Sequence, residues 1–94
     1  MGDQKKYMIE IVYGRGFLKS AQAIPKNELR KFASLLEELK RDPFYPKLHT
    51  KRLVGNLTGT LSFRITRDWR VIFMFIDPLT IQLLRVVHRK DAYR

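Results

Sequence analysis

The sequence has no cysteine among its 94 residues, which excludes a disulfide framework, a thiol nucleophile and a cysteine-rich zinc site. It also has no apolar run near the roughly 20 residues needed to cross a bilayer, and the N-terminus carries no apolar signal core. We therefore expect a cytoplasmic protein with no membrane association. A chain of this length has room for one small domain, and a hydrophobic content of 45% indicates a folded core.

Acidic residues are also scarce, and they are unevenly distributed. Residues 40–94 contain twelve Lys or Arg and four Asp, a balance of +8, and no Glu at all. Residues 1–39 contain seven basic and five acidic side chains, a balance of +2. The total of +10 exceeds what solubility requires and predicts a polyanionic partner, either a nucleic acid or an acidic protein surface. A surface that merely keeps copies of the protein apart is the alternative.

Hydrophobic periodicity in the first half predicts one strand followed by two helices. Alternating apolar residues favour a strand over 7–13, and the segment 17–24 is compatible with a short helix. Pro25 suits the start of a second helix, whose apolar residues recur at three- and four-residue spacing as far as Leu39. Pro43 disfavours helical geometry at Asp42 and is expected to end this helix.

The second half begins with a basic loop over 47–60 and continues with three predicted strands. Alternation indicates a half-buried strand over 61–66, an apolar run indicates a central strand over 69–76, and a turn at Asp77-Pro78 leads into a strand over 80–88. We therefore expect an α+β domain. Its small antiparallel sheet would consist of the N-terminal strand and a C-terminal three-strand meander, with both helices packed on one face.

Two segments, "KRLVGNLTGTLSFRITRDWRVIFMF" and "IQLLRVVHRKDAYR", resemble the RelE/ParE superfamily of toxins, particularly its RNA-cleaving RelE, YoeB and YafQ branches. The shared features are a basic residue before "L-x-G", an arginine-containing "RIT" strand, an aromatic-Arg-apolar strand and a terminal "HRKDAY". The resemblance implies that residues 1–94 form a single RelE-like toxin domain of a type II toxin–antitoxin system. It further implies a cognate antitoxin as partner, and metal-free, cofactor-free cleavage of messenger RNA in the A site of the small ribosomal subunit.

Metal-free RNA cleavage uses the ribose 2′-hydroxyl as nucleophile on the adjacent phosphate. The reaction needs a base near that hydroxyl, cations for the charge that builds on phosphorus, and an acid for the departing 5′-oxygen. Arginine suits the second task because its planar guanidinium binds two phosphate oxygens at once. Histidine is the natural proton carrier, and the sequence contains His49 and His88 alone.

The resemblance assigns roles to individual residues. Arg64 stands where relatives carry a histidine or lysine, so the chain lacks one titratable group of the pattern. Arg70 matches the aromatic-Arg position, and Lys51 precedes "L-x-G". The full expectation is a catalytic set and an RNA-binding set: Lys51, Arg64, Arg70, His88 and Tyr93 for catalysis, and Arg52, Asp68, Trp69, Arg89 and Lys90 for RNA contacts. The general base is left open among His88, His49 and Lys51.

Several alternatives remain at the level of sequence. A ParE-like toxin would bind DNA gyrase without cutting RNA, and a basic adaptor would bind ribosomal RNA without chemistry. For the individual residues, the alternatives are that Arg70 is a sheet residue paired with an acid such as Asp68 or Asp77, and that His88 caps a strand end. His49 follows "YPKL" in a loop and is read as a solvated residue. Scattered aspartates disfavour a metal nuclease, and basic residues on strands and loops disfavour a helix-turn-helix reader.

Strand parity gives one geometric prediction. Arg64 and Arg70 share a face of the sheet only if the hairpin connection between them has an odd number of residues. A connection over 67–69 would place Arg64 opposite Ile72. We predict that both arginines share a face, and that His88 and Tyr93 approach them from the last strand and the tail.

Overall fold

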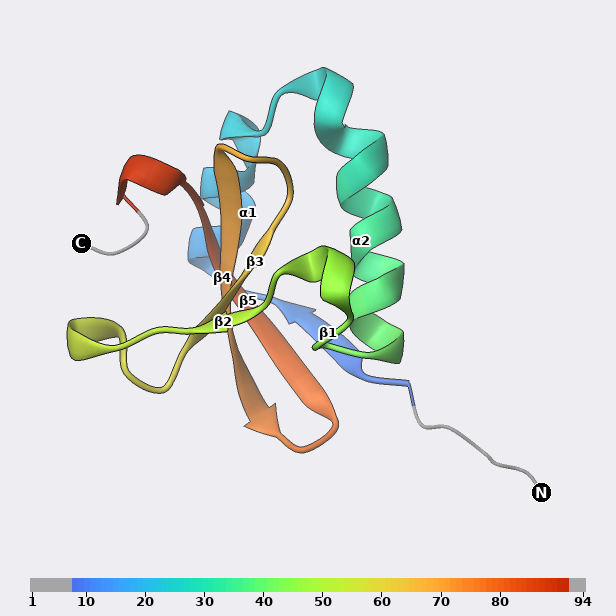
Figure 1. The fold of residues 1–94 in the computed structure, drawn as a ribbon, viewed down its shortest axis with the longest axis vertical. Coiled ribbons are helices and arrows are strands. Elements are labelled where there is room, and N and C mark those ends of the chain that lie inside the picture. The colour runs from blue at the N-terminus through green and yellow to red at the C-terminus, as the bar shows by residue number, and fades with distance from the viewer. Residues whose placement is uncertain (1–7, 92–94) are drawn as a thin grey trace.

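The computed structural model describes residues 8–91 (Figure 1). Within that range the helices are α1 (Arg15–Ser20) and α2 (Leu29–Arg41), and the strands are β1 (Glu10–Tyr13), β2 (Lys51–Arg52), β3 (Leu61–Arg64), β4 (Trp69–Asp77) and β5 (Thr80–His88). Single 3-10 turns cover Ala21–Ala23, Lys26–Glu28, Pro46–Leu48, Gly55–Leu57 and Arg89–Asp91. No helix in this range has the length and apolar character needed to cross a membrane.

The strands form one mixed sheet in the order β1-β5-β4-β3-β2. The predicted C-terminal meander is confirmed, since β3, β4 and β5 pair as antiparallel neighbours, and β4 is the central strand. Two details differ from the sequence prediction. β1 joins the edge of β5 in parallel, and a fifth strand, β2, lies within the predicted basic loop. Two residues are too few to produce a recognisable alternation, so β2 left no periodic signal.

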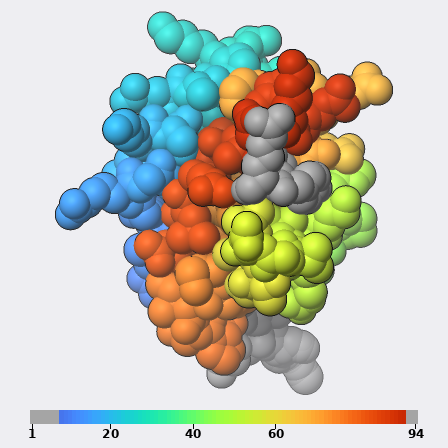
Figure 2. Space-filling model, turned by 90° about the vertical axis from the view of Figure 1, so that its left-hand side faces the viewer, coloured from blue at the N-terminus to red at the C-terminus, as the bar shows by residue number. Residues whose placement is uncertain are grey.

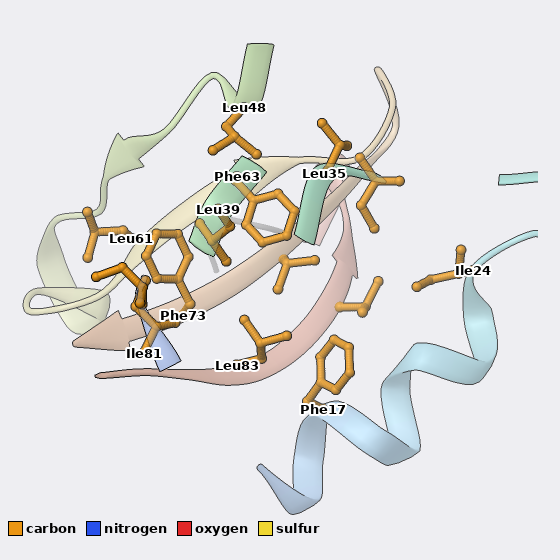
Figure 3. Close-up of a cluster of buried hydrophobic side chains, with 14 residues drawn as sticks. Phe17, Ile24, Leu35, Leu39, Leu48, Leu61, Phe63, Phe73, Ile81 and Leu83 are labelled. Atoms are coloured by element: carbon orange, nitrogen blue, oxygen red, sulfur yellow. The ribbon is translucent and has the colours of Figure 1, made fainter. Parts of the chain in front are cut away.

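Both helices pack on one face of the sheet, as predicted. Leu35 and Leu39 of α2 and Phe17 of α1 are buried against strand residues that include Phe63 and Phe73 (Figure 3). Apolar residues at helical spacing explain the formation of α2. The helix ends at Arg41 because Asp42, which precedes Pro43, adopts an extended backbone conformation. Figure 1 shows α2 along one side of the molecule, with the β2–β3 loop extending on the opposite side.

The two ends of the β4–β5 hairpin have distinct local structures. At the turn, the Asp77 carboxylate accepts a hydrogen bond from the backbone N–H of Leu79 at 2.9 Å, as expected for an Asp-Pro turn. At the other end, the Arg89–Asp91 turn follows β5 directly. Figure 2 shows this hairpin, in orange and red, on the same face of the molecule as the β2–β3 loop, in yellow.

Candidate active site

The β3–β4 hairpin brings Arg64 and Arg70 directly opposite each other. Directly opposed residues of an antiparallel pair project to the same face, so the prediction that the two arginines share a face is confirmed. The connection runs over 66–68, one residue earlier than the odd connection over 67–69 given above as an example, so Arg64 lies opposite Arg70 and not Ile72. Trp69 belongs to the ladder, and its carbonyl accepts a hydrogen bond from the N–H of Ile65 at 2.9 Å.

The paired arginines lie at a pocket of about 290 Å³ on the sheet face opposite the helices. β2 contributes to the same pocket because Lys51 pairs with Ser62, which lies two residues before Arg64 and so on the same face of β3. The lining residues are His49, Thr50, Lys51, Ser62, Arg64 and Arg70. The structure therefore brings together three of the predicted catalytic residues, Lys51, Arg64 and Arg70.

The lining of the pocket is strongly cationic. Among the described residues, the lining offers one ammonium, two guanidinium groups, one imidazole and two hydroxyls, and it includes no carboxylate. The Nε of Arg64 is buried and has no hydrogen-bond partner among residues 8–91, while Nη1 of Arg70 donates to the carbonyl of Arg67 at 3.2 Å. A buried donor without a partner costs free energy, and an anion in the pocket would satisfy it. The arrangement is suited to binding a phosphate group.

His49 lines the pocket, although the predicted catalytic set did not include it and it stood only among the three candidates for the general base. Its backbone is left-handed, with φ 50° and ψ 43°, and it follows the fully buried Leu48, which points into the core cluster in Figure 3. On its other side, the hydroxyl of Thr50 donates to the carbonyl of Pro43. The sequence signal for its position was the two-residue spacing between His49 and Lys51, because side chains two residues apart in an extended segment lie on the same side.

His88 and Trp69 lie elsewhere. The register pairs Trp69 with His88 and Arg70 with Val87, so His88 shares the face of Trp69, which packs against the helix-side core. The two rings meet edge to face, with centroids 5.2 Å apart. The prediction that His88 approaches the arginines is wrong, because its position in β5 has the opposite parity to the strand partner of Arg70. Tyr93 lies outside the described residues.

The predicted RNA-binding residues are distributed over several places. Asp68 forms an ion pair with Arg89 at 3.4 Å and accepts the N–H of Arg89 at its carbonyl, so the β3–β4 turn holds the start of the C-terminal turn. Lys90 is exposed beside it. Arg52 pairs with Leu61, on the other side of β2 from the pocket, and its guanidinium lies 5.8 Å from the centre of the Phe44 ring.

Comparison of the sequence finds no matching family model and no matching curated protein. Solved structures match along most of the chain. The toxin–antitoxin complex RelBE2 from Mycobacterium tuberculosis superposes with a TM-score of 0.72 and 25% identity, covering 95% of this chain and all of that chain. The archaeal RelE–RelB complex from Pyrococcus horikoshii OT3 gives 0.71 and 24%, covering 90% and 99%. YafQ from Escherichia coli BL21(DE3) gives 0.68 and 16%, covering 92% and 99%.

These similarities confirm the resemblance to the RelE, YoeB and YafQ toxins and the α+β fold that it implied. The similar structures include two complexes of a RelE with a RelB, and a YoeB–YefM complex from Staphylococcus aureus, 23% identical to this chain, has a TM-score of 0.66. Proteins of one fold carry different activities, and the activity resides in the residues of the site.

Proposed function

We propose that this protein is the toxin of a type II toxin–antitoxin system, and that it cleaves messenger RNA on the ribosome without a metal ion. The observation that carries the proposal is the opposed pair Arg64 and Arg70, which lines a pocket together with Lys51 and with no carboxylate from residues 8–91. Two guanidinium groups and an ammonium form a set of donors matched to a phosphodiester. The buried Nε of Arg64, which has no hydrogen-bond partner in the described part of the chain, also supports phosphate binding.

In the proposed reaction the pocket binds the phosphate that follows the nucleotide to be cut. The 2′-oxygen of that nucleotide bonds to phosphorus, and the bond from phosphorus to the 5′-oxygen of the next nucleotide breaks. The products are a 2′,3′-cyclic phosphate and a 5′-hydroxyl end. Arg64 and Arg70 stabilise the negative charge that accumulates on the phosphoryl oxygens, and Lys51 adds a further cation at the β2 edge of the pocket.

An antitoxin follows as the proposed partner. The RelE–RelB and YoeB–YefM structures are complexes by their descriptions, and the basic half of this chain is complementary to an acidic segment. Such a segment would set its acids against Lys51, Arg64 and Arg70 and place apolar residues on exposed side chains such as Val54, which is 82% exposed. Binding of this kind would block the pocket.

Primer extension on a reporter messenger RNA, translated with and without the protein, tests the proposal. We expect discrete new 5′ ends within the translated region when the protein is present. Arrest of bacterial growth with no new RNA ends would contradict the ribonuclease assignment and favour a ParE-like toxin that acts on gyrase. Ribosome binding with neither cleavage nor growth arrest would favour the adaptor and contradict the toxin assignment.

A further inference from the structure

Among the described residues that line the pocket, one has a side chain of a type that exchanges a proton near neutral pH. Its cations are Lys51, Arg64 and Arg70, contributed by β2, β3 and β4, and lysine and arginine ordinarily keep their charge well above pH 8. The hydroxyls of Thr50 and Ser62 do not ionise in that range. The imidazole of His49 is therefore the group of the pocket that is suited to act as a general base.

The backbone around His49 is held in a way that presents this side chain. Leu48 is fully buried, and the hydroxyl of Thr50 is bound to the carbonyl of Pro43, so both neighbours of His49 are fixed. Between them, the backbone of His49 takes a left-handed conformation, which residues other than glycine adopt infrequently and at some cost in free energy. The imidazole is exposed at the pocket and makes no hydrogen bond or ion pair with the described residues.

His88 differs from His49 in its hydrogen bonding, in its ring contacts and in the face of the sheet that it occupies. Its Nδ1 accepts a hydrogen bond from the backbone N–H of Lys90 at 3.2 Å, its ring packs against Trp69, and it lies on the other face of the sheet. One ring nitrogen is thus occupied by the backbone and the ring is fixed away from the pocket. Of the two histidines, His49 alone lines the pocket together with the paired arginines, and its side chain makes no hydrogen bond with the described residues.

We propose that His49 is the catalytic residue that takes the proton from the attacking 2′-hydroxyl; this inference rests on the ribonuclease function proposed above. The neutral imidazole accepts the proton as the 2′-oxygen bonds to phosphorus. The 5′-oxygen leaves with the electron pair of its bond to phosphorus and takes a proton from solvent water. The resulting hydroxide is neutralised by the proton that His49 releases, so the residue returns to its starting state.

The test compares His49→Asn with His88→Asn in single-turnover cleavage of ribosome-bound messenger RNA between pH 5 and 8. Asparagine adopts the left-handed conformation more readily than most residues, so His49→Asn keeps the turn. We expect His49→Asn to slow cleavage by about 10²–10⁴-fold, the usual contribution of a positioned base, with ribosome binding unchanged. We expect His88→Asn to stay within a few-fold of the wild type.

The pH profile and chemical rescue separate a proton carrier from a structural residue. Wild-type cleavage should decline at low pH, because a general base has to be neutral to accept a proton, and His49→Asn should lose this dependence. His49→Gly should regain activity when imidazole is added to the buffer. If the wild type cleaves and His49→Asn cleaves equally fast, the role of His49 is refuted while the ribonuclease function stands. If the wild type makes no cut, the proposed function itself fails.

Discussion

At the scale of single residues, the distinctive feature is a pair of like charges placed face to face. Arg64 and Arg70 are direct partners across β3 and β4, and like charges in this position destabilise a sheet. The Nε of Arg64 is buried without a hydrogen-bond partner from the described residues, which adds the cost of desolvation. A fold that keeps such a pair without a ligand is expected to gain stability when the pair is removed, as happens at sites built for binding.

This gives a prediction for Arg64→Met, which keeps most of the aliphatic stem and removes the charge and the unpaired donor. We expect the free energy of unfolding to rise by about 1 kcal/mol, the low end of the cost of a buried unsatisfied polar group. Denaturant unfolding measures this, with Arg30→Met on the exposed side of α2 as the control, for which we expect little change. A loss of stability in Arg64→Met would mean that the guanidinium supports the fold.

Residue-level prediction from the sequence succeeded where spacing carried the information. The shared face of Arg64 and Arg70 followed from an odd hairpin loop, and the register confirms it. The position of His49 depends on a buried Leu48 and on a hydrogen bond between Thr50 and Pro43, which are tertiary contacts. His88 was placed by its match to a family position, and this gave no information about which face of β5 it occupies.

At the scale of elements, periodicity predicted most of the fold. The last strand was expected over 80–88 and β5 has these bounds, and α2 ends where Pro43 required it to end. β2 escaped prediction because it has two residues and owes its existence to pairing with β3. The parallel contact of β1 with β5 is a long-range choice, and the alternation within 7–13 contains no information about direction.

Gly14 joins β1 to α1, and the packing there gives a prediction for an element. A Cβ at this position would meet the backbone oxygen of Leu83 at 2.8 Å, closer than side-chain carbons approach, and β5 cannot move without disturbing the sheet. We expect Gly14→Ala to destabilise the protein by about 1–3 kcal/mol, the usual cost of overpacking. Thermal unfolding measures the effect, with Gln22→Ala at an exposed position as the control. Equal stability of Gly14→Ala and the control would show that α1 is free to shift relative to β5.

At the scale of the whole molecule, charge is the dominant property. Residues 51–91, which form β2 to β5, their loops and the turn after β5, hold eight Lys or Arg against three Asp, a balance of +5, and the three cations of the pocket are among them. Composition alone predicted a polyanionic partner. The order of motifs predicted a resemblance to RelE-like toxins, and the chain is similar to solved structures of such toxins. Neither source placed the cations around one cavity, because that depends on the register of three strands.

The phosphate-binding account predicts a steep dependence of RNA affinity on salt. Contacts with phosphates release counterions, so several contacts should weaken binding by orders of magnitude between roughly 50 and 200 mM salt. Removing Arg70 should reduce the slope of log affinity against log salt by about 0.7, the contribution of one contact to a single strand. Arg30→Ala, which removes the same charge from α2, should leave the slope unchanged. A flat salt dependence for the wild type would contradict a phosphate-binding surface.

The central claim is that the arginine pair stabilises the transition state of RNA cleavage, and the single-turnover rate of Arg70→Ala on ribosome-bound messenger RNA tests it most directly. Loss of one charge-stabilising donor predicts a rate lower by about 10²–10³-fold, with folding retained and Arg30→Ala cleaving like the wild type. Cleavage by Arg70→Ala at the wild-type rate would show that Arg70 is a structural residue of the sheet and would contradict the account.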